Sequence, residues 1–182
     1  MLHLLLEKLV GMVPLFRKLF VSLNSMKRIA LFPGSFDPFT RGHEQLVESA
    51  LRLFDKVIIA IGSNCAKSAL LSIEQRRELI ETLYKDDERV EVATYDTLTV
   101  DFARKVGATA VVRGVRSSID FEFERNLDAV NRRLAPDVQT ILLMTDAAYA
   151  HVSSSTVREL LAFGHSVEEY MPTKIDLSQY LK

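Results

Sequence analysis

The sequence predicts an α/β fold of the Rossmann-like kind, in which a doubly wound, five-stranded parallel sheet with strand order 3-2-1-4-5 forms a single domain. Strand and helix patterns alternate from Lys27 to the C-terminus, which is typical of a parallel sheet with helices on both faces. The run Val57–Ile61 is continuously apolar, as expected for a strand buried on both faces. We expect right-handed crossovers and a ligand beyond the carboxyl ends of strands one and four, where the order reverses.

The expected elements follow one another without an internal repeat or a linker. Strands are expected at residues 28–32, 56–61, 90–95, 110–112 and 140–144. Helices are expected at residues 44–54, 72–84, 100–106, 119–134 and 156–163, with a last short helix from about 178. Ser72 and Gln75 have the spacing of a capping box at the start of the second helix. Gly107 and Gly164 are expected to end two helices, and the long helix stops before Pro136.

Length and composition favour one globular domain. The chain has 182 residues and a formal net charge of -1, so it is long enough to bury a sizeable core. The balanced charge argues against a general nucleic-acid binder. A single cysteine, Cys65, excludes an internal disulfide framework and a cysteine zinc cluster. It also fits a reducing compartment, so we expect a cytoplasmic protein without a nucleic-acid partner.

Residues 1–25 differ from the rest of the chain because they are rich in leucine, with apolar residues near helical spacing. Their longest uncharged run, Leu9–Phe16, is too short to span a bilayer, and no small-residue cleavage site precedes the first strand. Two interpretations stay open. The segment is either an amphipathic helix that binds an interface or a partner, or an apolar extension outside a folded domain at 26–182. We favour the second and expect no stable membrane anchor.

The segment Phe32–His43 has the composition of an anion site between a strand and a helix. Helix N-terminal N–H groups lack intrahelical partners, and the helix dipole favours negative charge there. Gly34 has no Cβ, so the backbone can approach a ligand closely. His43 falls in or near the first turn of the helix, where its imidazole would meet a bound phosphate. An ordinary turn with a satisfied histidine is the alternative.

Two further segments are expected at the same edge of the sheet. Arg113-Gly114-Val115-Arg116 is expected as a loop after the fourth strand, with two guanidiniums suited to phosphate oxygens and a glycine that permits tight curvature. His151–Glu159 is a Ser-rich helix start, in which Thr156 and Glu159 have capping-box spacing. Surface arginines and a plain helix cap are the alternatives, but the shared position at the switch point favours a phosphate site.

Three other candidates carry weaker signals. Lys67 follows the second strand and is either a mobile cation at the crevice or a solvated loop lysine. Asp120 and Glu124 lie on one helix face, where ribose contact and pairing with a neighbouring arginine are about equally expected. The chain contains neither a P-loop nor a GxGxxG fingerprint, and its carboxylates have no recognisable metal spacing, so we assign no metal ligands.

The string Thr40-Arg41-Gly42-His43, preceded by Gly-Ser-Phe-Asp-Pro, resembles the T/HxGH signature of the nucleotidyltransferase superfamily. With the Lys67 loop, RGVR, DFEFE, VNRR and VSSSTVRE in this order, the chain from about Met26 resembles the phosphopantetheine adenylyltransferase family of coenzyme A synthesis. Thr40 in the first motif position, and RGVR followed by DFEFE, favour this family over the nicotinate-mononucleotide and cytidylyl branches. Ser35 and Thr99 stand where many relatives have Thr and Met.

The resemblance implies that the adenylyl group of ATP is transferred to 4′-phosphopantetheine, giving dephospho-coenzyme A and pyrophosphate. It also implies Mg²⁺ accompanying ATP, coenzyme A as a feedback ligand, and a homohexamer. The residues implied for catalysis are His43, Lys67 and Arg116. The residues implied for ATP binding are Ser35, Phe36, His43, Gly114, Arg116, Glu124, Ser153, Ser154 and Ser155. The residues implied for the acceptor are Ser35, Lys67, Leu98, Thr99, Arg113 and Asn131.

Two rival functions remain. One is a sibling enzyme such as a nicotinate-mononucleotide adenylyltransferase, which the Ser-Ser-Thr-Val-Arg sequence would also fit. The other is a regulatory module that binds a nucleotide without catalysis. Loss of His43 or of either loop arginine would favour the regulatory module, and all three residues are present.

Overall fold

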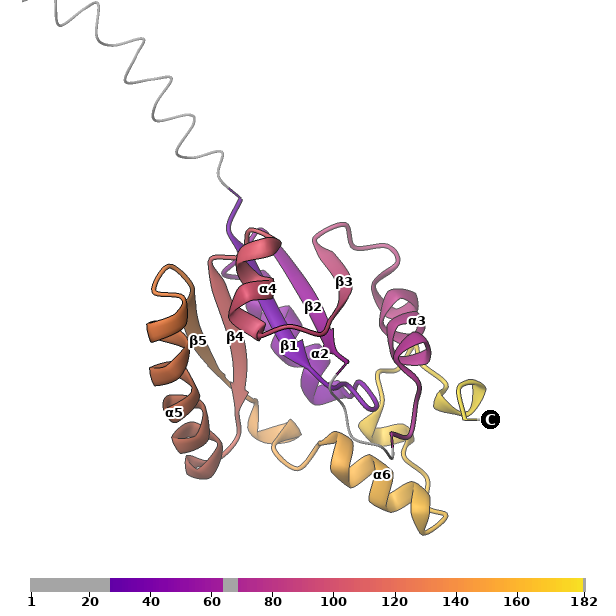
Figure 1. Cartoon of the computed structure of the whole chain (residues 1–182). Coiled ribbons are helices and arrows are strands. Elements are labelled where there is room, and N and C mark those ends of the chain that lie inside the picture. The colour runs from indigo at the N-terminus through magenta and orange to yellow at the C-terminus, as the bar shows by residue number, and fades with distance from the viewer. Residues whose placement is uncertain (1–26, 64–68, 182) are drawn as a thin grey trace, which may run out of the picture.

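The computed structural model of the chain describes residues 27–63 and 69–181 (Figure 1). The N-terminal segment 1–25, Cys65 and Lys67 lie outside the described residues, and the expectations for them stay predictions. None of the helices in the described part of the chain has the length and hydropathy needed to span a bilayer.

Five parallel strands form the sheet, in the order β3-β2-β1-β4-β5. The strands are β1 (Ile29–Gly34), β2 (Lys56–Gly62), β3 (Val90–Tyr95), β4 (Ala110–Val115) and β5 (Gln139–Met144). This arrangement confirms the predicted fold class and strand order. The order reverses between β1 and β4, so the loops that follow these two strands open at the predicted switch point.

Within the described residues, five α-helices connect and cover the strands, and three short 3₁₀ helices follow β5. The α-helices are α2 (Arg41–Leu51), α3 (Ile73–Tyr84), α4 (Thr99–Lys105), α5 (Ser118–Leu134) and α6 (Ser154–Ala162). The 3₁₀ helices are η1 (Ala147–Tyr149), η2 (Glu168–Tyr170) and η3 (Leu177–Gln179). The predicted last helix from about 178 is therefore a single 3₁₀ turn.

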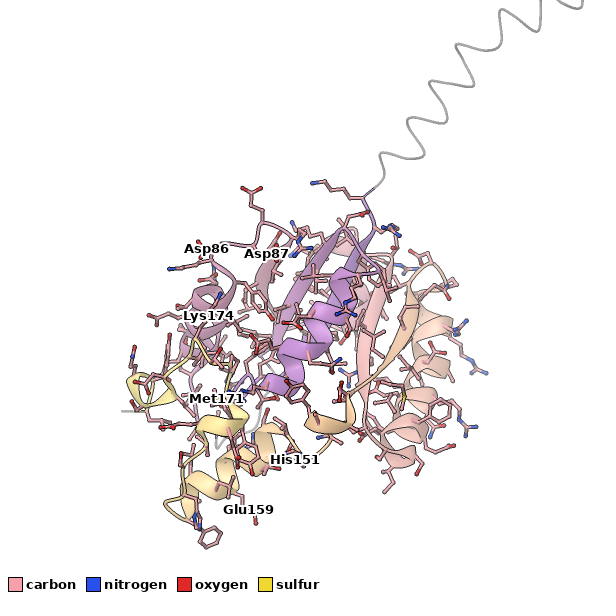
Figure 2. The ribbon with its side chains drawn as sticks, turned by 180° about the vertical axis from the view of Figure 1, so that it is seen from behind. Asp86, Asp87, His151, Glu159, Met171 and Lys174 are labelled. Atoms are coloured by element: carbon pink, nitrogen blue, oxygen red, sulfur yellow. The ribbon has the colours of Figure 1, made fainter. Side chains whose placement is uncertain are left out.

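Two apolar clusters fill the space above and below the sheet, which explains the continuous apolar runs of the central strands. Ile59 of β2 belongs to the cluster that also contains side chains of α2, α3, α6 and the C-terminal segment, whereas its neighbour Ile58 belongs to the cluster that contains side chains of α4. Figure 2 shows α2 lying across its face of the sheet, with the C-terminal segment that carries Met171 beside it. Arg41 Nε donates to the Met171 carbonyl oxygen at 2.7 Å, which fixes this segment to the start of α2.

The structure corrects the predicted loop after the fourth strand. β4 continues to Val115, so Arg113 and Gly114 lie in a strand and only Arg116 follows it. Gly114 is not at a tight turn. A Cβ added there would lie far inside van der Waals contact of Leu46 Cδ1 on α2, so the glycine serves the close approach of helix and strand.

Two helix starts also differ from the prediction. α2 begins at Arg41 rather than residue 44, with Thr40 as its N-cap, because the side chain of His43 completes a capping box there. At α6 the cap is Ser153, whose Oγ accepts from the Thr156 N–H at 3.1 Å, so the predicted cap at Thr156 is wrong. The capping box of Ser72 and Gln75 at α3 is confirmed.

Candidate active site

A cavity of about 340 Å³ opens at the carboxyl ends of β1 and β4, where the strand order reverses. The residues that line it come from the end of β1 and the β1–α2 loop, from α2, from the end of β4 and Arg116 after it, from the segment between β5 and α6, and from the start of α6. They are Phe32, Pro33, Gly34, Ser35, Phe36, Thr40, Gly42, His43, Leu46, Arg113, Gly114, Arg116, Thr145, Val152, Ser153, Ser154, Ser155 and Arg158. The three sequence segments expected to share an anion site therefore meet in one cavity.

Side chains from three other elements hold the backbone at the end of β1 and in the β1–α2 loop. Arg113 of β4 donates to the Pro33 carbonyl oxygen at 3.0 Å, and Arg76 of α3 donates to that of Ser35 at 3.1 Å. From α6, Arg158 donates to the Asp37 carbonyl oxygen at 2.6 Å, and Ser154 donates to that of Pro38 at 2.8 Å. These bonds fix the loop before any ligand binds, as electrostatic preorganisation requires.

Phe36 occupies a strained position at the centre of this loop. Its φ is +49°, in the left-handed region that residues other than glycine rarely adopt. The ring is buried and packs edge-on against the His43 imidazole, with centroids 5.1 Å apart. A Cβ on Gly34 would lie 2.7 Å from the same ring, so Gly34 is needed to make room for Phe36.

His43 lines the cavity and turns one ring nitrogen, Nδ1, toward the backbone of Thr40. The Thr40 N–H donates to Nδ1 at 3.0 Å, so Nδ1 is an acceptor and the neutral ring carries its proton on Nε2. Burial, followed by the positive charge of Arg116, lowers the pKa of His43 to about 4. The imidazole is thus a neutral Nε2–H donor at physiological pH, in the wall of the cavity.

The two arginines of the RGVR segment each have a carboxylate partner on α5. Arg113 binds Glu124 through two bonds, at 2.6 and 2.9 Å, whereas Arg116 Nε lies 3.2 Å from Asp120 Oδ2. Pairing with arginine, one of the two options for these carboxylates, is therefore what the structure shows. Arg113 and Arg116 both still line the cavity, and the Arg116 side chain is 39% exposed.

The Ser-rich start of α6 brings hydroxyls and backbone N–H groups to the cavity. Ser153 caps the helix, Ser154 holds the β1–α2 loop, and Ser155 Oγ accepts from Arg158 at 3.3 Å. Arg158 of the VSSSTVRE segment, a residue that sequence reasoning missed, lies on the cavity wall. Its position four residues after Ser154, hence on the same helix face, was the signal that could have identified it.

Four predicted residues are not among the described residues that line the cavity, namely Leu98, Thr99, Glu124 and Asn131. Glu124 acts on the cavity only through Arg113. Leu98 is 57% exposed just before α4, and Thr99 Oγ1 lies 3.0 Å from the Tyr95 hydroxyl. Asn131 lies on α5 thirteen residues after Ser118, or roughly 20 Å along the helix axis from the end that meets β4. Their roles stay predictions.

Sequence reasoning missed two buried charged residues beneath the site, Asp37 and Arg76. Asp37 belongs to the signature string but received no role. Arg76 lies within an ordinary-looking amphipathic helix, and no pattern along the chain distinguishes it from the exposed Arg77 beside it.

An α/β sheet with a TxGH segment, a neutral histidine and convergent arginines at its switch point is the arrangement of a nucleotidyltransferase. The sequence profile described as cytidylyltransferase-like matches residues 31–160. The protein named phosphopantetheine adenylyltransferase from Porphyromonas gingivalis is 53% identical over 146 residues, which cover 80% of this chain and 95% of that protein. The protein of the same name from Bacteroides thetaiotaomicron is 46% identical over 151 residues, covering 83% and 99%. This chain belongs to the phosphopantetheine adenylyltransferase family.

Solved structures of other adenylyltransferases share the fold. A bifunctional NMN adenylyltransferase/ADP ribose pyrophosphatase from Francisella tularensis matches with a TM-score of 0.64 at 23% identity, over 86% of this chain and 49% of that one. A putative nicotinate-nucleotide adenylyltransferase from Vibrio parahaemolyticus matches with a TM-score of 0.55 at 21% identity, over 82% and 96%. At these identities the likeness concerns the fold alone.

Proposed function

We propose that this chain transfers the adenylyl group of ATP to 4′-phosphopantetheine, giving dephospho-coenzyme A and pyrophosphate. The observation that carries the proposal is the neutral Nε2–H of His43, which faces a cavity bordered by Arg113, Arg116 and Arg158. Family membership, with 53% identity to a protein of that name, supports the choice of acceptor.

The reaction exchanges one phosphoanhydride bond for another. An oxygen of the acceptor phosphate attacks the α-phosphorus of ATP, and the bond from that phosphorus to the oxygen bridging to the β-phosphate breaks. Both reactants are anions, so the protein has to align them and neutralise the charge that develops in the transition state. A neutral histidine suits this task, because it donates a hydrogen bond to an α-phosphate oxygen without giving up its proton.

The side chains around His43 would bind ATP and the acceptor. Arg116 and Arg158 would neutralise the phosphates of ATP, together with the N–H groups at the start of α6. Ser35, Phe36, Gly114, and Ser153 to Ser155 line the same wall. Lys67 and Arg113 are assigned to the acceptor phosphate, with Leu98, Thr99 and Asn131 along the pantetheine arm, on the family resemblance.

Mg²⁺ is proposed as a companion of ATP rather than as an ion held by protein ligands. Within residues 27–63 and 69–181, no group of three or more His, Cys, Asp and Glu side chains could hold a metal ion. The described lining of the cavity contains no Asp or Glu. The ATP phosphates would therefore carry the ion, and the arginines would act beside it.

We also propose that the protein works in the cytoplasm as a homohexamer with coenzyme A as a feedback ligand. Support for self-association comes from α5, which exposes large apolar side chains. Ile119 is 79% exposed and Phe123 63% exposed, and Val130 and Leu134 continue the exposed apolar surface along the helix. Sedimentation velocity tests the assembly, and a monomer at micromolar concentration would contradict it.

The test of the reaction is pyrophosphate release from ATP and Mg²⁺ with 4′-phosphopantetheine, beside nicotinate mononucleotide and a no-acceptor control. We expect release only with phosphopantetheine and dephospho-coenzyme A as the second product. Release only with the mononucleotide would move the chain to the sibling branch. If folded protein binds ATP but releases no pyrophosphate with any acceptor, the result would favour the regulatory module.

A further inference from the structure

A buried ion pair lies directly beneath the β1–α2 loop, outside the cavity. Asp37 belongs to the loop and Arg76 to α3, and Arg76 Nε lies 3.4 Å from Asp37 Oδ1. The two side chains are only 9% and 2% exposed, respectively. Charged side chains are rarely buried, because removing them from water costs free energy. The burial of this pair therefore indicates that it has a specific role in the protein.

The side chains of both residues form hydrogen bonds with backbone groups. The two carboxylate oxygens of Asp37 accept from the N–H groups of Leu70 and Leu71, at 2.9 and 2.8 Å. Arg76 donates to the Leu71 carbonyl oxygen through Nε at 2.9 Å and Nη2 at 2.7 Å, and to that of Ser35 through Nη1 at 3.1 Å. The pair therefore joins the β1–α2 loop to the segment that leads into α3.

The bond to Ser35 acts at the strained point of the loop. Phe36, with φ at +49°, lies between Ser35, whose carbonyl oxygen is held by Arg76, and Asp37, whose carbonyl oxygen is held by Arg158. A residue in a rarely populated conformation persists only where the surroundings over-determine it. The Phe36 ring packs against the His43 imidazole, with the ring centroids 5.1 Å apart. The backbone conformation of the loop therefore influences the position of the imidazole.

We propose that Asp37 and Arg76 are positioning residues for adenylyl transfer, which hold Ser35 and Phe36 in place and so fix the orientation of His43. The inference rests on the proposed function for its kinetic consequence, although the orientation of His43 can be measured without turnover. Neither residue is among those that line the cavity. A guanidinium suits this position because its planar fork serves the carbonyl groups of Leu71 and Ser35 at once in a fixed geometry, whereas the ammonium of a lysine is a compact group without that fork.

The kinetic test compares Arg76→Lys, which keeps the charge, with Asp37→Asn, which keeps the shape. We expect the kcat of each variant to fall about 100-fold, the effect of roughly 1 Å misplacement, with the dissociation constant of ATP nearly unchanged. Ile58→Ala is the matched control, because Ile58 is 2% exposed in the cluster on the opposite face of the sheet. That variant should lose stability but keep kcat at temperatures where it is folded.

The second readout is the NMR titration of the His43 ring, assigned by the resonance that disappears in His43→Gln. In the unmodified protein His43 should titrate at about pH 4. In Arg76→Lys and Asp37→Asn we expect its pKa to rise toward the ordinary value, because a relaxed Phe36 admits water to the ring. Ile58→Ala should leave the titration unchanged.

The outcomes separate the inference from the proposed function. Variants with normal kcat and a His43 ring that titrates at about pH 4 would overturn the inference while leaving the function intact. A kcat loss no larger than that of Ile58→Ala at equal destabilisation would also overturn it. If the unmodified protein fails to turn over, the His43 titration alone decides the positioning role. Should Arg76→Lys not fold, Asp37→Asn carries both measurements.

Discussion

Arg113 of β4 and Glu124 of α5 form a two-point ion pair, with Nη2 2.6 Å from Oε1 and Nε 2.9 Å from Oε2. The Glu124 side chain is only 7% exposed and that of Arg113 is 26% exposed. Arg113 Nη1 also donates to the Pro33 carbonyl oxygen near the end of β1, so the arginine of β4 joins α5 to β1. The carboxylate of Glu124 therefore already neutralises part of the positive charge that Arg113 could offer to a substrate.

This pairing predicts that Arg113→Met destabilises the protein more than the double variant Arg113→Met/Glu124→Gln. The single change leaves a carboxylate buried without its partner, which costs about 3–5 kcal/mol of unfolding free energy. Neutralising Glu124 as well should recover most of that loss. Urea unfolding of the four combinations measures the coupling, and additive losses would contradict the pairing.

The role of Arg113 toward the acceptor can then be tested in the Glu124→Gln background, where the stability effect is smaller. We expect Arg113→Ala to raise the KM for phosphopantetheine more than the KM for ATP. Steady-state kinetics with each substrate varied in turn supplies the comparison. An equal loss for both substrates would remove Arg113 from the acceptor site.

The capping bond between Thr40 and His43 predicts different outcomes for two substitutions. His43→Ala should nearly abolish turnover, lower stability by about 1 kcal/mol through loss of the cap, and leave ATP affinity within a few-fold. His43→Gln should keep the cap, because Gln75 already accepts from the Ser72 N–H in the same way at 2.8 Å. Turnover by His43→Gln should still fall about 100-fold. Unchanged kcat in either variant would rule out His43 as the donor to the α-phosphate.

The low pKa of His43 predicts a pH dependence of stability. Burial, followed by the charge of Arg116, lowers it to about 4, below the ordinary value of 6.5. Between these values the unfolded chain binds more protons than the folded one, so this contribution to stability rises with pH. It is fully present above about pH 6.5 and is lost as the pH falls toward 4.

The measurement is the unfolding free energy of the protein and of His43→Gln between pH 4 and pH 8. As the pH falls, the unfolding free energy of the unmodified protein should decrease relative to that of His43→Gln, because glutamine does not titrate. The rate kcat/KM should likewise show no ionisation of His43 between pH 5 and pH 8. A kinetic pKa near 6.5 that disappears in His43→Gln would contradict the neutral assignment.

Gly114 predicts a steric effect rather than a loss of backbone freedom. In Gly114→Ala the new methyl group displaces Leu46, which is 6% exposed, and overpacking of this kind costs about 1–3 kcal/mol. The same substitution in a Leu46→Ala background should cost much less. Gly62→Ala is the control, since a Cβ there would lie 3.6 Å from the Tyr95 hydroxyl, an ordinary contact. Equal costs with and without Leu46 would contradict this account.

Much of the fold could be predicted from the sequence because the signals are local. Continuous apolar runs marked strands buried on both faces, and their alternation with helices led to the observed order β3-β2-β1-β4-β5. The errors fall at element ends, where tertiary contacts decide. β4 runs on through Arg113 and Gly114 because β5 continues to pair with it, up to Val115 opposite Met144.

The candidate site was predicted in its parts but not in its internal pairing. The segments around His43, Arg113 and Ser153 were all expected at one edge of the sheet, because parallel strands bring their carboxyl ends together. That Arg113 binds Glu124, or that a buried Arg76 holds Ser35, depends on side chains that meet only after the chain has folded.

The sequence by itself determined the class of fold, the family resemblance and the segments that meet at the cavity, since these follow from periodicity and from short contiguous motifs. The tertiary structure decided which charges are already compensated, which nitrogen of His43 carries the proton, and why Gly34 and Gly114 lack side chains. The physical reason is that each of these contacts depends on the positions that residues take in the folded chain. Arg76 and Ser35 are 41 positions apart, and Gly34 meets the Phe36 ring in a loop where Phe36 has a φ of +49°. Neither contact leaves a pattern in the sequence of one segment.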